Sequence, residues 1–137
     1  MSSKTSLVET NQRPLLPAGL KPYYEHKGIA IIHGDCREVL PTLGPVDLVL
    51  TDPPYGIGEA RKNNQSRSKL ATSRDYGKAA WDDAPPSDWL FGLMREVSRF
   101  QIIFGGNYFT LPPTSCWLVW DKVNGKNDFA DCELAWT

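Results

Sequence analysis

The segment Asp52-Pro53-Pro54-Tyr55 combines residue types that can act on an amine. Each proline fixes its own φ angle and keeps the residue before it extended, so the backbone after Asp52 is nearly rigid. The Asp52 carboxylate and the Pro53 carbonyl oxygen can therefore be aimed together at a group with two N–H donors, such as an exocyclic base amine. Tyr55 offers a flat face on which a base can stack. The segment favours activation of an amine by hydrogen bonding and positioning; the simpler interpretation is a proline-rich turn in which Asp52 binds its own backbone.

The position of this segment favours the chemical interpretation, because it follows an apolar run at residues 46–50. Similar β-branched and aromatic runs lie at residues 29–32, 100–104 and 117–120. Such runs are typical of strands buried on both faces of a parallel sheet. Polar or glycine-rich residues follow each run, and open parallel sheets bind their ligands beyond the carboxyl ends of the strands.

Two helices are predicted between these strands. Asp35 lies three residues before Glu38, an acidic variant of the capping box, and predicts a short helix that ends near Pro41 to Gly44. Ser87 is the predicted N-cap of a second helix. Its apolar face, with residues spaced at i, i+3, i+4 and i+7, consists of Leu90, Leu93, Met94 and Val97. This order of elements predicts an α/β fold with a mostly parallel sheet and flanking helices.

A basic segment, residues 58–80, separates the catalytic candidate from the second helix. It contains six basic and two acidic side chains, with many Ser and Asn and hardly any apolar residues. A loop of this length within a compact domain is usually functional. Two interpretations stay open: a solvated surface loop, or a segment whose cations contact nucleic-acid phosphates. The candidate DNA-binding cations are Arg61, Lys62, Arg67 and Lys69, together with Lys122 after the last apolar run.

The composition of the whole chain, 137 residues with a net charge of −1, suits one globular domain or a piece of a larger one. The chain has no apolar run of the roughly 18 residues that cross a bilayer, and its start lacks an apolar signal core. Three cysteines without Cys-x-x-Cys spacing disfavour a disulfide scaffold or a zinc site. Apart from Asp35 near His33, no metal-ligand spacing surrounds the histidines. We expect a cytoplasmic domain without metal or membrane segment, with residues 1–21 as a flexible lead-in.

At its Asp-Pro-Pro-Tyr segment the chain resembles the S-adenosylmethionine-dependent DNA methyltransferases that methylate exocyclic amino groups. Their catalytic motif, Asp/Asn/Ser-Pro-Pro followed by an aromatic residue, stands here as Asp52, Pro53, Pro54 and Tyr55. The resemblance covers about residues 22–137 and implies that they form the catalytic part of a Rossmann-like methyltransferase domain. Asp at the first motif position implies methylation of adenine N6 in DNA. Cytosine N4, for which Ser is more common at that position, is the near alternative.

The resemblance also implies where the methyl donor binds. Residues 32–36 look like the family's Gly-Asp motif, which assigns Asp35 and Cys36, together with Asp52, to S-adenosylmethionine. The family's Phe-x-Gly-x-Gly motif, which cradles the methionine part of the donor, does not precede Asp52. The chain therefore looks like the N-terminal part of an enzyme in which the catalytic motif comes first. The glycine motif would lie in a missing C-terminal half or on a second chain; an inactive remnant or subunit is the other alternative.

Two further features have open interpretations. Gly105-Gly106, after the run at residues 100–104, indicates either backbone crowding near a bound base or cofactor, or a bend at the strand end. The five tryptophans are predicted to lie mainly in the core. Trp81 is the best candidate among them for stacking on a base, because it directly follows the basic segment.

Overall fold

The computed structural model describes residues 16, 19–58, 80–123 and 130–137. The chain divides into two compact units, one up to Pro45 and one from Val46 onward. Most of the expected lead-in, residues 1–21, lies outside the described residues, as do residues 59–79 of the basic segment. The DNA-binding candidates Arg61, Lys62, Arg67 and Lys69 therefore stay predictions.

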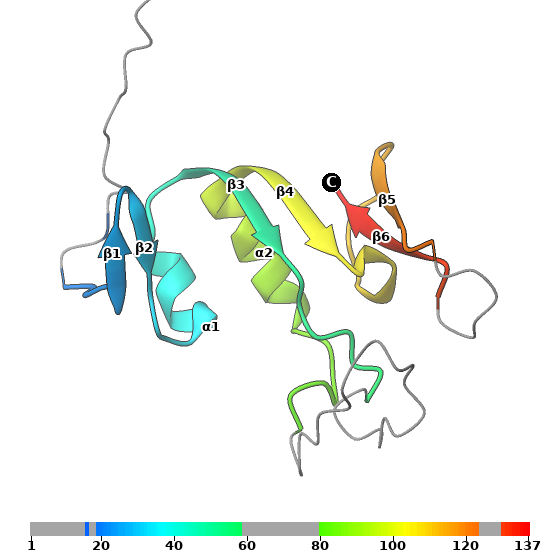
Figure 1. Cartoon of the computed structure of the whole chain (residues 1–137), viewed down its shortest axis with the longest axis horizontal. Helices are drawn as coiled ribbons and strands as arrows, with labels where there is room; N and C mark the ends of the chain where they lie inside the picture. The colour runs from blue at the N-terminus through cyan, green and yellow to red at the C-terminus, as the bar shows by residue number, and fades with distance from the viewer. Residues whose placement is uncertain (1–15, 17–18, 59–79, 124–129) are drawn as a thin grey trace, which may run out of the picture. The chain divides into compact units, whose positions relative to one another are not determined.

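The first unit contains a two-stranded antiparallel hairpin and a short helix (Figure 1). Strand β1 (Tyr24–His26), which sequence patterns did not predict, pairs with β2 (Ile29–Ile31). Lys27 and Gly28 between them both have positive φ angles, the geometry of a type I′ turn. The run at residues 29–32 thus forms a strand as predicted, but its partner is β1 and not the larger sheet.

Helix α1 (Cys36–Val39) begins where the sequence predicts it. The Asp35 side chain accepts a hydrogen bond from the backbone N–H of Arg37 at 2.9 Å, so it is the N-cap. A 3₁₀ turn, Leu40–Thr42, continues the helix and ends within the predicted Pro and Gly stop region.

The second unit is built on a four-stranded mixed sheet in the order β3-β4-β6-β5 (Figure 1). Strand β3 (Val46–Thr51) is parallel to β4 (Ser98–Phe104), whereas β6 (Cys132–Trp136) is antiparallel both to β4 and to β5 (Trp117–Asp121). The expectation of a mostly parallel sheet is therefore corrected. A parallel pair needs a long crossover, which helix α2 (Asp88–Val97) supplies between β3 and β4, whereas only residues 122–131 join β5 to β6.

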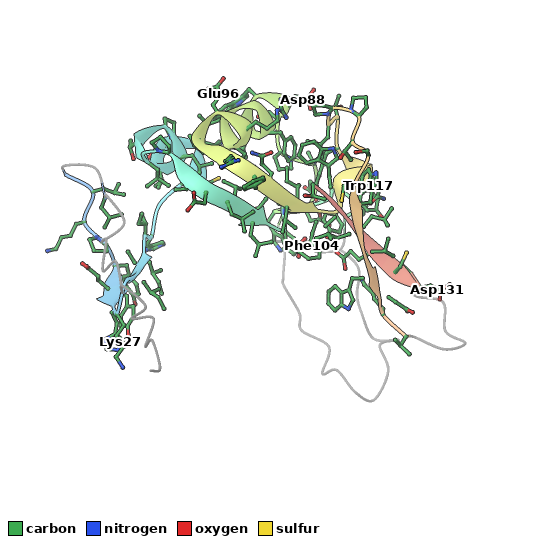
Figure 2. The ribbon with its side chains drawn as sticks, turned by 90° about the horizontal axis from the view of Figure 1, so that it is seen from above. Lys27, Asp88, Glu96, Phe104, Trp117 and Asp131 are labelled. Atoms are coloured by element: carbon green, nitrogen blue, oxygen red, sulfur yellow. The ribbon has the colours of Figure 1, made fainter. Side chains whose placement is uncertain are left out.

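Helix α2 covers one face of this sheet (Figure 2). It begins after Ser87, as predicted, although the Ser87 side chain makes no capping hydrogen bond. Leu90, Phe91 and Met94 are buried on its inner side, and Ile103 of β4 is fully buried. No helix in the described ranges is long and apolar enough to cross a membrane.

The other face of β3 and β4 is open among the described residues. Leu48 and its parallel partner Phe100 have exposed fractions of 46% and 56%, and Leu50 is 62% exposed. The prediction that these strands are buried on both faces is wrong for this part of the sheet, because α2 covers only one side. The shared direction of β3 and β4 brings their carboxyl ends to one edge, where Asp52 and Gly105 follow (Figure 1).

Candidate active site

A pocket of about 360 Å³ lies at the carboxyl end of β3. All four residues of the Asp-Pro-Pro-Tyr motif contribute to it, and the connection before α2 and strand β6 complete it. Its lining residues are Asp52, Pro53, Pro54, Tyr55, Ile57, Trp81, Asp82 and Glu133. A volume of this size is within the range of small-molecule sites. The sequence-predicted catalytic residues are thus brought together in one concave site.

The Tyr55 ring is held between aromatic neighbours that come from the loop after β4. It stacks on Tyr108 with ring centroids 5.0 Å apart and an interplanar angle of 11°. Phe109 approaches it edge-on at 6.0 Å. One face of Tyr55 is therefore already used inside the protein, which limits the area that a base could cover. The other aromatic residue of the pocket is Trp81, whose exposed fraction is 52%.

The two glycines after β4 allow this close packing. Gly105 has a φ angle of +67°, and a Cβ atom there would lie 2.2 Å from Cε1 of Tyr55. A Cβ atom on Gly106 would lie 2.6 Å from Cβ of Trp136 in β6. The chain therefore bends at the end of β4, and its backbone is crowded against Tyr55 of the motif. Crowding near a bound base or cofactor stays a prediction.

The Tyr55 hydroxyl lies between two carboxylates. It is within hydrogen-bond distance of Oδ1 of Asp52, at 2.7 Å, and of Oε1 of Glu133. Burial raises the pKa of Tyr55 above its ordinary value, and the hydrogen bonds to Glu133 and Asp52 raise it further, because both favour the protonated phenol. The hydroxyl therefore keeps its proton and serves as a donor.

Glu133 is an ionised carboxylate on β6 that the sequence analysis did not assign to the site. Burial alone would raise its pKa, but hydrogen bonds from Lys122 and Tyr55 outweigh that effect and hold the pKa below its ordinary value. The Lys122 Nζ atom lies 2.7 Å from Oε2 of Glu133. Lys122, predicted to contact DNA, therefore has a partner within the protein, and its phosphate contact stays a prediction.

The acid stability of the chain should depend on Glu133. Because its pKa in the folded state lies below the ordinary value of 4.5, its contribution to stability is present above that value and is lost as pH falls through the folded-state pKa. We expect the difference in unfolding free energy between the wild type and Glu133→Gln to shrink as pH is lowered from about 6 to about 3. Urea unfolding at several pH values measures it; a difference that stays constant would contradict the assignment.

Asp82 fixes the backbone that follows the motif, and its side chain is only 2% exposed. Its Oδ1 accepts a hydrogen bond from the Gly56 N–H at 2.8 Å, and its backbone carbonyl accepts one from the Gly58 N–H at 3.0 Å. Sequence reasoning missed this role, since the only local signal is an Asp shortly before Pro85-Pro86. Asp82 therefore positions the turn after Tyr55 from a distant point in the sequence.

The predicted donor-binding residues Asp35 and Cys36 lie in the first unit, so their predicted proximity to Asp52 stays a prediction. The Asp35 carboxylate caps α1 and pairs with the Arg37 side chain. These hydrogen bonds with Arg37 lower the pKa of Asp35 to about 2. Cys36 is exposed and is the first residue of α1. Within the described ranges, no group of three or more His, Cys, Asp or Glu side chains could hold a metal ion.

Comparison with known proteins relates the chain to a class of enzyme. The chain is similar to a type II methyltransferase, which supports a relationship to methyltransferases. That relative is M.ScaI of Streptomyces caespitosus, which is 35% identical over 60 residues. The matched segment covers 42% of this chain and spans about a fifth, 20%, of the relative. No protein-family model and no solved structure matches the chain.

Proposed function

We propose that this chain is the catalytic part of an enzyme that transfers a methyl group from S-adenosylmethionine to the N6 amine of adenine in DNA. The observation that carries the proposal is the pocket that gathers Asp52, Pro53, Pro54 and Tyr55 at the end of β3. The similarity to a type II methyltransferase supports methyl transfer as the class of reaction. Asp at the first motif position favours adenine N6, with cytosine N4 as the alternative.

The proposed chemistry relies on two acceptors next to each other in the chain. Asp52 and Pro53 both line the pocket at the end of β3, so a carboxylate and a rigid backbone carbonyl can face one extruded base. When both amine N–H groups donate hydrogen bonds to these two acceptors, the nitrogen is drawn toward tetrahedral geometry and its lone pair is freed from the ring. The methyl donor supplies an electrophilic carbon whose bond to sulfur breaks as the N–C bond forms. The methylated amine then loses one proton to Asp52 or to water.

The residues in the pocket fit a base better than the whole methyl donor. The carboxylates and aromatic rings suit a flat base with an amine, whereas the sequence supplies no Phe-x-Gly-x-Gly loop before Asp52 for the donor's methionine part. We propose that this loop comes from a C-terminal half or from a second chain. An inactive subunit that keeps only the base pocket is the second candidate, favoured by the same missing loop.

DNA is the proposed partner, and the cytoplasm is the proposed location. Lys122 pairs with Glu133, which lines the pocket, so its ammonium group is close enough to the pocket to contact a phosphate flanking the extruded base as well. Arg61, Lys62, Arg67 and Lys69 would extend this contact. The salt dependence of DNA binding measures their number, since each phosphate contact adds to the slope of affinity against salt concentration.

The proposed function predicts weak, amine-dependent binding of a nucleoside by the chain itself. We expect 2′-deoxyadenosine to shift the NMR signals of Tyr55, Trp81 and Gly56. We also expect it to bind about fivefold more tightly than purine 2′-deoxyriboside, which lacks the amine; this factor corresponds to one net hydrogen bond. S-adenosylmethionine should bind weakly or not at all in calorimetry. Equal binding of the two nucleosides would contradict the base pocket. Tight donor binding and methylation of DNA by this chain alone would contradict the missing-half proposal.

A further inference from the structure

The Tyr55 hydroxyl has one proton and two carboxylate acceptors, Asp52 and Glu133. It can donate to only one of them at a time. The carboxylate that receives this hydrogen bond is a weaker acceptor for any further donor, because the bond withdraws electron density from the oxygen. Whether the hydroxyl donates to Asp52 or to Glu133 therefore changes how strongly Asp52 can bind the amine of a substrate.

Glu133 is held in place as the second acceptor for the hydrogen bond from the Tyr55 hydroxyl. Its Oε2 pairs with Lys122, which leaves Oε1 for Tyr55. The positions of Lys122 and Glu133 are fixed by the pairing of β5 with β6. Asp121 pairs with Cys132, and Lys122 and Glu133 are the residues that follow these two. The backbone N–H of Lys122 also donates to the Asp131 carbonyl at 2.9 Å. The Glu133 side chain is only 16% exposed, so water competes weakly for its oxygens.

We propose that Glu133 and Lys122 form a positioning pair that draws the Tyr55 hydroxyl away from Asp52 when a base amine enters the pocket. The inference rests on the proposed function, because it gives Tyr55 a second role besides its flat face. Without an amine the hydroxyl lies within hydrogen-bond distance of both carboxylates, and its single proton can go to either of them. With an amine present it turns to Glu133, and both oxygens of Asp52 become available to the amine. Glu133 acts through Tyr55 and is a positioning residue, not a catalytic one.

The test uses the ratio of affinities for 2′-deoxyadenosine and purine 2′-deoxyriboside, measured by NMR titration of the chain. Glu133→Gln replaces an acceptor by an amide that can donate to the Tyr55 oxygen, which directs the Tyr55 proton permanently to Asp52. We expect this variant to lose most of the roughly fivefold preference for the amine. Lys122→Met, which leaves Glu133 without its orienting partner, should lose part of it.

Two controls separate this effect from general damage. Glu96→Gln makes the same chemical change on the exposed side of α2 and should leave the ratio unchanged (Figure 2). In a Tyr55→Phe background, where the hydroxyl is absent, Glu133→Gln should have no further effect on the ratio. Thermal unfolding of each variant confirms that the fold persists.

The outcomes are distinguishable. If the wild type discriminates between the nucleosides and Glu133→Gln discriminates equally well, the positioning role is overturned and the proposed function stands. The role is also overturned if Glu133→Gln lowers the ratio by the same factor with and without the Tyr55 hydroxyl, since Glu133 then acts independently. If the wild type binds both nucleosides equally, the proposed function fails, and the positioning role fails with it.

Discussion

On the proposed function, replacing Asp52 with alanine is expected to abolish methyl transfer in any full-length or reconstituted form of the enzyme. Asp52 lies just beyond β3 with an exposed side chain, so its removal opens no core cavity. In the proposed mechanism the carboxylate acts mainly as charge develops on the amine nitrogen. Its loss should therefore lower kcat by about a hundredfold or more and affect substrate binding less. Product analysis after digestion of the DNA to nucleosides measures the loss and identifies the methylated base.

Two control variants sharpen this experiment. Asp47→Ala removes a carboxylate from an exposed position of the same strand and should leave kcat near the wild-type value. Asp52→Asn keeps an amide oxygen that can accept one hydrogen bond from the amine, so it should retain more activity than Asp52→Ala. Activity retained by both Asp52 variants would remove Asp52 from the reaction. A product methylated at cytosine N4 would retain the mechanism and change the substrate base.

The parts of the site that follow from local chemistry could be predicted from the sequence. The two prolines restrict the backbone after Asp52 whatever the surrounding fold, and the apolar run before them is a strand in the structure. The N-cap Asp35 is also local, since its side chain binds the backbone two residues further on. These predictions depend on spacing within a few residues, and the sequence contains that spacing in full.

The parts that depend on tertiary contacts could not be predicted. Glu133 reaches Tyr55 across 78 positions of the chain, and only the pairing of β6 with β4 explains how. Asp82 binds Gly56 across 26 positions without any spacing signal. The antiparallel direction of β6 could not be predicted from the sequence either, because a short apolar strand has the same residue pattern in parallel and antiparallel pairs. The hydroxyl contacts of Tyr55 with two carboxylates were also beyond local sequence reasoning, which considered only the flat face of its ring.

Gly105→Ala is expected to disrupt the site from outside the motif. The new Cβ atom would lie 2.2 Å from Cε1 and 2.6 Å from Cζ of the Tyr55 ring, which already stacks on Tyr108. The φ angle of +67° adds strain for any residue with a side chain. Together, strain and overpacking should cost about 2–4 kcal/mol of unfolding free energy. Tyr55 should shift, and its hydroxyl should leave Asp52 and Glu133.

Gly58→Ala is the matched control, because Gly58 has nearly the same φ angle, +68°, but no atom of the described residues lies within 4 Å of its added Cβ atom. It should cost only the conformational strain, about 1–2 kcal/mol. Urea unfolding gives both values, and NMR titration with 2′-deoxyadenosine reports the pocket. We expect Gly105→Ala to weaken nucleoside binding and to abolish the preference for the amine, whereas Gly58→Ala keeps that preference. Equal destabilisation by the two variants, with the preference intact in both, would contradict this prediction. Gly105 would then be required only for the backbone bend, and the Tyr55 ring could move aside for the added Cβ atom without loss of the site.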